Sequence, residues 1–141
     1  MRPRLVLVIA WRLASLIAGK VSAQGVTLTV EDVRNNSGQI IVLVFDDAEA
    51  SDFLAHEWTV GYAAVPAQPS GVSHSSFNLT SGPYAIFVFH DENADWDVNS
   101  DGKLLLEGVA ANGAPGAEDM PDFHAASIWP GPVSFTLHYG D

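Results

Sequence analysis

The sequence predicts an all-β protein, an antiparallel β-sandwich of about seven strands with one long acidic loop and little helix. Two observations predict this fold. Short apolar or alternating segments recur roughly every 8–15 residues, separated by Gly, Pro, Asn and Ser. In addition, a single segment has helical character. An open barrel is the alternative architecture that the same pattern allows.

The first two strands are predicted within residues 26–45. Val26, Leu28 and Val30 alternate with polar residues, which is the period of a half-buried strand. Residues 38–45 are apolar on both faces, which indicates a central strand. Because the Asn-Asn-Ser-Gly sequence of residues 35–38 is typical of a turn, we expect the two strands to pair as a hairpin.

The later elements follow from the same patterns. The segment 46–57 (DDAEASDFLAHE) is the one with helical character, and we expect only a turn or two of helix there. The segment YAIFVFH at 84–90 is the most apolar strand, and alternation in 132–139 predicts the closing one. Further strands are predicted at 58–65, where prolines follow, and at 72–79.

Residues 1–23 have the features of a secretory signal peptide. Arg2 and Arg4 precede a short apolar run, and a small-residue ending at Ala23 predicts cleavage before Gln24. Arg12 interrupts the run, which is shorter than the ~20 residues of a spanning helix. We therefore expect an exported protein, periplasmic or extracellular, with a single domain at 24–141; a retained membrane anchor is the alternative.

Charge and cysteine content exclude several classes of function. Cleavage after residue 23 would leave two basic residues against 17 acidic ones, a formal charge of −15. Such a chain repels nucleic acid and anionic membranes and favours cations as partners. The sequence has no cysteine, which excludes disulfides, thiolate chemistry and cysteine-ligated zinc. A protein or glycan partner stays open.

The loop after the apolar strand has the composition of a calcium site. Oxygen-bearing side chains occupy every second position of its first part, and calcium takes six to eight oxygen ligands. Crowded carboxylates also repel one another until a cation neutralises them. The alternating residues are Asp91, Asn93, Asp95, Asp97, Asn99 and Asp101.

Residues 97–102 (DVNSDG) match the start of an EF-hand-type loop, as in dockerin modules. We therefore expect Asp97, Asn99, Asp101 and the carbonyl of Lys103 as the main ligands, with Asp91, Asn93 and Asp95 as a second or shared set. Glu107 is a further candidate, although it stands one place before the position of the bidentate acid, and no amphipathic helix follows. We therefore predict Ca²⁺ in a β context, bound by the loop 91–103. A solvated acidic loop without an ion is the alternative.

Two other functions are compatible with the sequence. His90, Asp91 and His124 could form the site of a small metal-dependent hydrolase, although no zinc-protease motif and no G-x-S-x-G elbow occurs. Trp96 and Trp129 could form the platform of a carbohydrate-binding module. A hydrogen-bonded histidine and dispersed aromatic anchors are the plainer interpretations, so we predict no enzyme and no catalytic residue.

Five segments carry a family resemblance: 38–45 (GQIIVLVF), 82–93 (GPYAIFVFHDEN), 107–112 (EGVAAN), 121–126 (PDFHAA) and 135–139 (FTLHY). Together they resemble an exported bacterial family catalogued as domain of unknown function 2141. The resemblance spans nearly all of residues 24–141 and implies a transthyretin- or immunoglobulin-like β-sandwich without an assigned activity. This chain departs from the family pattern by additional acids around Trp96 and by His124 where an acid is common.

Overall fold

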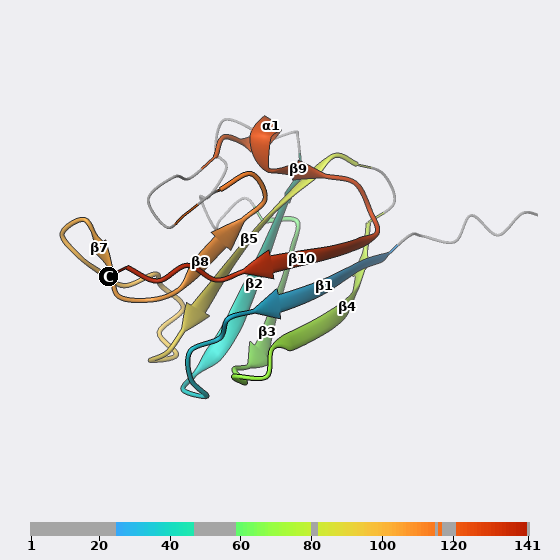
Figure 1. The fold of residues 1–141 in the computed structure, drawn as a ribbon. Coiled ribbons are helices and arrows are strands. Elements are labelled where there is room, and N and C mark those ends of the chain that lie inside the picture. The colour runs from blue at the N-terminus through green and yellow to red at the C-terminus, as the bar shows by residue number, and fades with distance from the viewer. Residues whose placement is uncertain (1–24, 47–58, 80–81, 115, 117–120, 141) are drawn as a thin grey trace, which may run out of the picture.

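The computed structural model describes residues 25–46, 59–79, 82–114, 116 and 121–140, and it shows two β-sheets facing each other (Figure 1). The predicted β-sandwich is therefore confirmed. The smaller sheet has the strand order β10-β1-β4. Its strands are β1 (Gly25–Glu31), β4 (Val72–Asn78) and β10 (Pro132–Thr136).

The larger sheet has the order β3-β2-β5-β8, and β9 pairs with the beginning of β5. Within the described residues, a hairpin of β6 and β7 and the short helix α1 lie in the long segment after β5. The strands of the larger sheet are β2 (Gln39–Asp46), β3 (Gly61–Pro66), β5 (Tyr84–Asp91), β8 (Val109–Ala111) and β9 (Ser127–Ile128). The hairpin is β6 (Ser100–Asp101) with β7 (Leu104–Leu105), and the helix is α1 (Phe123–Ala126).

The main core lies between the two sheets. It is built from alternate residues of each strand, because successive side chains of a strand point to opposite faces. β1 contributes residues 26, 28 and 30, β2 contributes 40, 42 and 44, and β5 contributes 84, 86 and 88. The closing strand behaves as predicted, since Phe135 and Leu137 are buried while Val133 and Tyr139 pack against the same core.

The predicted hairpin between the first two strands is wrong. β1 pairs with β4 and, in parallel, with β10, whereas β2 pairs with β3 and β5. Residues 32–38 instead carry the chain from one sheet to the other. At the end of this crossing Gly38 has φ +63°, and a Cβ there would lie 1.9 Å from the carbonyl oxygen of Asp91. The close approach requires glycine.

The central position predicted for residues 38–45 is confirmed, since β2 lies between β3 and β5. Both of its faces are covered because a second apolar cluster occupies the outer face of the larger sheet. There α1 packs its buried residues, Phe123 and Ala126, near Phe87 and Phe89 of β5. An Asp122 carboxylate caps α1 by accepting from the amide of Ala125.

The predicted signal peptide and the predicted helical turns of 46–57 lie outside the described residues, apart from Asp46, which ends β2. Nothing helical in the described ranges has the length and apolar character to cross a membrane.

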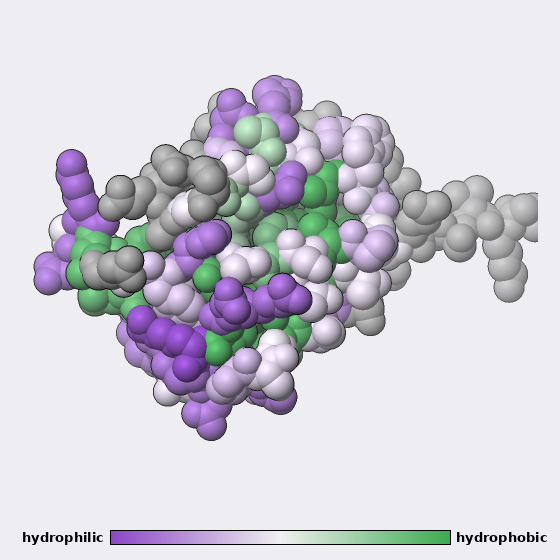
Figure 2. Space-filling view, in the orientation of Figure 1, coloured by the Kyte–Doolittle hydropathy of each residue, from purple (hydrophilic) through white to green (hydrophobic). Residues whose placement is uncertain are grey.

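Apolar side chains are exposed on the β6–β7 hairpin and its flank, where Figure 2 shows green surface surrounded by hydrophilic residues. These are Leu104 and Leu106.

Candidate functional site

Asp91 anchors the beginning of the acidic loop. It ends β5 and is fully buried, on the outer side of the larger sheet opposite Gln39. Its Oδ1 accepts from the amide N–H of Asp95 at 3.1 Å. Its Oδ2 accepts from the amide of Trp96 at 3.1 Å and from the side-chain amide of Gln39 at 3.0 Å. Both carboxylate oxygens therefore accept hydrogen bonds from the loop backbone, and Oδ2 also accepts one from the neighbouring strand β2.

Glu107 closes the other end of the same loop. It is 3% exposed, and its Oε1 accepts from the amide N–H of Glu92 at 2.8 Å. Its Oε2 accepts from the amide of Asn99 at 3.0 Å. One buried carboxylate thus ties two positions of the loop together. The buried charge is compensated by two N–H donors, which is the usual condition for burying a carboxylate.

Between these anchors, three polar side chains converge at the surface. Asp95 Oδ2 lies 2.8 Å from Asn93 Nδ2 and 3.0 Å from Asn99 Nδ2, and Asn93 Nδ2 lies 2.9 Å from Asn99 Oδ1. We call Asn93, Asp95 and Asn99 the loop triad. The hydrogen bond from Asn99, followed by those from the Asp97 amide and Asn93, lowers the pKa of Asp95 and keeps it charged.

The remaining predicted ligands lie elsewhere. Asp97 is exposed, and its amide N–H donates to Asp95 Oδ1 at 2.9 Å. Asp101 and Lys103 are exposed on the β6–β7 hairpin, whose turn places Gly102 at φ +63°. The end of the segment matching an EF-hand-type loop, residues 100–102, thus lies in a tight hairpin. Among the described residues, no group of three or more His, Asp or Glu is placed to hold a metal ion.

An ion pair that sequence reasoning missed joins the sheet crossing to the loop. Arg34 donates to Glu92 twice, from Nε at 2.8 Å and from an Nη at 2.5 Å. It also donates to the carbonyl of Leu106, and its guanidinium lies 4.5 Å from the Tyr139 ring centroid. The side-chain amide of Asn35 also donates to Glu92 Oε1. The hydrogen bonds from Arg34 first, and from Asn35 after it, lower the pKa of Glu92. Arg34 stands just before the predicted turn of residues 35–38, and no sequence pattern indicated its pairing with Glu92.

His90 is enclosed rather than open to a substrate. It is fully buried at the inner side of β5, and its Nε2 donates to the carbonyl of Ser37 at 2.8 Å. Its Nδ1, 2.9 Å from the hydroxyl of Tyr139, is then the acceptor of that contact. The same hydroxyl accepts from the amide of Arg34 at 3.1 Å. Burial raises the pKa of Tyr139, so the phenol stays protonated and able to donate.

The second histidine of the hydrolase hypothesis lies elsewhere. His124 is exposed on α1, which packs on the outer face of the larger sheet and precedes β9. β9 pairs with Tyr84 and Ala85 at the opposite end of β5 from His90 (Figure 1). The structure therefore places His90 on the inner face of the larger sheet near the end of β5, and His124 on the outer face near the beginning of β5.

Trp96 and Trp129 also lie near opposite ends of β5. Trp96 follows its end, whereas Trp129 follows β9 and lies against Gly82 near its beginning. Trp96 instead meets Tyr62 of β3 edge to face, with ring centroids 6.2 Å apart and planes at 78°. Its backbone has φ +68°, which is uncommon for a bulky residue and is held by the hydrogen bond to Asp91.

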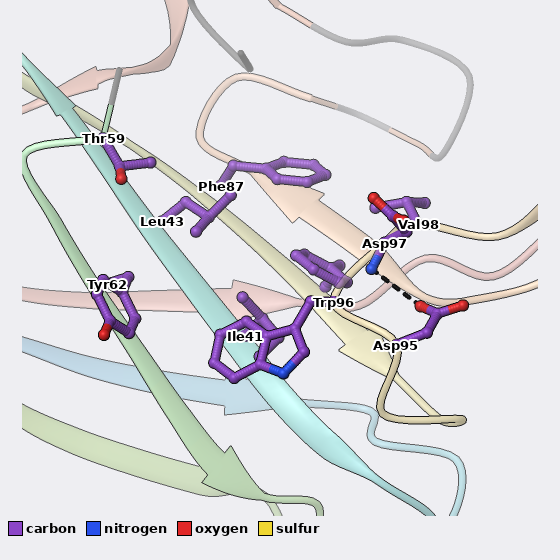
Figure 3. A pocket seen from close by; sticks show the side chains of 10 residues that line it. Ile41, Leu43, Thr59, Tyr62, Phe87, Asp95, Trp96, Asp97 and Val98 are labelled. Atoms are coloured by element: carbon purple, nitrogen blue, oxygen red, sulfur yellow. Dashed lines mark hydrogen bonds between the residues drawn. The ribbon is translucent and has the colours of Figure 1, made fainter. Parts of the chain in front are cut away.

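The two rings border a groove of about 680 Å³ on the outer face of the larger sheet (Figure 3). Sequence reasoning missed this groove, because Tyr62 and Trp96 come from elements whose relative position depends on strand pairing. The groove is lined by Ile41, Leu43, Thr59, Tyr62, Phe87, Phe89, Asp95, Trp96, Asp97 and Val98.

Comparison with known proteins shows the family. A family model described as an uncharacterized protein conserved in bacteria (DUF2141) matches residues 28–131. Neither the curated proteins nor the solved structures include a match to the chain. The matched residues contain both buried anchors, Asp91 and Glu107, and the loop triad between them. Since the model covers well over half of the chain, this protein belongs to the bacterial family of domain of unknown function 2141.

Proposed function

We propose that the chain is an exported, non-enzymatic β-sandwich protein that binds Ca²⁺ at the loop 91–103. The observation that supports the proposal is the convergence of the loop triad, Asn93, Asp95 and Asn99, around a charged carboxylate. The oxygen and nitrogen of an amide exchange places by a half-turn of the side chain. Such a turn of Asn93 and Asn99 would present their oxygens to a cation beside Asp95.

The buried anchors make this loop a suitable frame for an ion. Asp91 and Glu107 fix four backbone amides of residues 92–99, so binding would not have to order the whole segment. One carboxylate and two amide oxygens are fewer than calcium's six to eight ligands, so carbonyls and water would complete the shell. A site with one charged ligand is expected to be weak, which suits an extracellular module.

The proposal assigns no reaction to the protein. His90 has both ring nitrogens engaged, by Ser37 and Tyr139, and His124 lies at the other end of β5. Export is proposed from the basic and then apolar residues 1–23. N-terminal sequencing of protein recovered outside the cytoplasm should begin at Gln24, whereas an intact Met1 terminus would contradict cleavage.

Thermal unfolding of the purified protein in calcium and in chelator tests whether the folded protein binds the ion. Binding stabilises the folded state by RT ln(1 + [Ca²⁺]/Kd), about 2.7 kcal/mol at a hundredfold excess over Kd. We expect a higher midpoint in calcium and a smaller shift in magnesium, which requires stricter octahedral geometry. Equal midpoints in calcium and in chelator would refute the proposal.

A matched pair of variants locates the site. Asp95→Asn removes the charge of the loop triad and should abolish most of the calcium-dependent shift. Asp101→Asn makes the same change on the exposed hairpin and should leave the shift intact. The opposite result, with loss only in Asp101→Asn, would assign the ion to the EF-hand-like register of residues 97–101 and refute the triad.

A further inference from the structure

We propose that the groove between Trp96 and Tyr62 binds a small organic cation with an apolar body, such as an aryl-alkyl ammonium. The groove lies on the outer face of the larger sheet and does not depend on a metal ion at the loop triad. Its volume of about 680 Å³ is within the range of small-molecule sites, about 300–1,000 Å³.

The floor of the groove is apolar. Ile41 and Leu43 of β2 lie opposite Phe89 and Phe87 of β5 in the strand register. All four line the groove, and the phenylalanine rings stack with centroids 5.9 Å apart. In Figure 3 the side chains of Leu43 and Phe87 stand on the strands facing the space beside Trp96. Ile41, Phe87 and Phe89 are themselves at most 7% exposed, so a ligand with an apolar body would remove from water mainly the half-buried Leu43 and the exposed rings of Tyr62 and Trp96.

The walls of the groove are aromatic and unusually exposed. Tyr62 is 67% exposed and Trp96 50% exposed, although both are large and partly apolar. Their edge-to-face arrangement presents more than one ring orientation to the same space. Aromatic faces attract cations through their quadrupole, and tryptophan does so best.

The charge at the rim is of one sign. Asp95 and Asp97 flank Trp96 in sequence and both line the groove. None of the lining residues that the structure describes is basic. Arg34 is paired with Glu92, and Lys103 lies in the turn of the β6–β7 hairpin. Two carboxylates beside an aromatic wall favour a cation and disfavour an anion of the same shape.

The position of Trp96 is set before any ligand arrives. Its amide is held by the buried Asp91, and the loop on either side is tied by Glu107. These hydrogen bonds fix the backbone of Trp96, and its half-exposed ring already contacts Tyr62, so less freedom remains to be lost on binding. Pre-organisation of this kind is typical of a binding wall and distinguishes Trp96 from an aromatic residue that merely fills a core.

Three probes with the same body test the charge preference. They are 4-phenylbutylammonium, 4-phenylbutanol and 4-phenylbutyrate, titrated into the protein in chelator and followed in NMR by the backbone amide signals of Leu43 and Phe87, which line the groove and are retained in every variant. We expect the ammonium to bind about threefold or more tightly than the alcohol, and the carboxylate to bind most weakly. Added salt should reduce this preference. Equal affinities, preference for the carboxylate, or absence of binding would each overturn the proposal.

Two matched pairs of variants locate the binding. Trp96→Ala should weaken ammonium binding about tenfold, whereas Trp129→Ala, at the other end of β5, should leave it unchanged. Asp97→Asn should weaken the ammonium about threefold without affecting the alcohol, and Asp101→Asn should change neither. Equal losses of ammonium affinity within either pair would contradict binding in the groove. Since Asp97 lies outside the loop triad and the titrations contain chelator, failure here leaves the calcium proposal untouched.

Discussion

Two sets of carboxylates in one segment have opposite environments. Asp91 and Glu107 are buried and accept hydrogen bonds from five N–H groups between them, whereas Asp95, Asp97 and Asp101 are exposed. The buried set determines the course of the backbone, and the exposed set determines the charge that the loop presents to solvent. The buried Asp91 belongs to the same alternation as the exposed Asp95, Asp97 and Asp101, so spacing alone does not reveal the division of roles.

The largest expected effect comes from removing a buried carboxylate. Asp91→Ala leaves the amides of Asp95 and Trp96 and the side chain of Gln39 without their acceptor. Each buried donor without an acceptor costs about 1–3 kcal/mol, and partial hydration reduces the total. We expect a loss of about 2–4 kcal/mol in the free energy of unfolding, measured by urea denaturation.

Asp97→Ala is the matched control from the exposed set. It removes the same group from the same loop and should change stability by less than about 0.5 kcal/mol. Comparable losses in the two variants would mean that burial does not separate the two sets.

Glu107→Gln sharpens the same comparison with a smaller change. The amide keeps one acceptor oxygen but turns an NH₂ group toward the amide of either Glu92 or Asn99. We expect a loss of about 1–2 kcal/mol. Hydrogen exchange should show faster exchange at one or both of those amides, while amides of β2 stay protected. Unchanged exchange at both amides would contradict the role of Glu107 as the acceptor that joins the two ends of the loop.

Much of the fold could be predicted from hydrophobic periodicity. The half-buried β1, the largely apolar β2 and β5 and the alternating β10 are all strands of the structure. The pairing of β1 with β2 could not be predicted, because a turn sequence does not say whether the chain returns to the same sheet or crosses to the other. The different burial of β1 and β2, on one face and on both, was the available clue.

The site was less predictable. Spacing identified the residues that the loop brings together, including Asp91, Asn99 and Glu107, but not that two of them are buried clasps. It also grouped Asp101 with them, whereas the turn at Gly102 places that residue on a hairpin. The groove depends on β3 lying next to β2, so Tyr62 and Trp96 meet only after the sheet has formed.

The pair of Arg34 and Glu92 predicts a pH dependence. Its hydrogen bonds lower the pKa of Glu92 from its usual 4.5, so the stabilisation is present above that pH and lost as pH falls through the lower folded value. Glu92→Gln should therefore be less stable than the native protein at pH 7, by less than about 1 kcal/mol because solvent screens the pair. Urea denaturation across pH should show the two stabilities converging below pH 4.5. A constant difference would contradict the linkage.

The smallest expected effect is a gain in stability. Ala94 lies in the loop with φ +59°, a left-handed conformation that an L-residue adopts at a cost of about 1 kcal/mol and that glycine adopts freely. Its side chain is exposed, so little packing is lost on its removal. Ala94→Gly should thus raise the free energy of unfolding by about 0.5 kcal/mol, because the greater freedom of glycine in the unfolded chain offsets part of the relief. Ala64→Gly, an exposed β3 position in ordinary strand conformation, is the control and should lower stability instead. If both substitutions were destabilising, the backbone at Ala94 would not be strained. Asp91, which accepts from the amides of the next two residues, would then not impose this conformation, and the buried carboxylates would not determine the backbone of the loop.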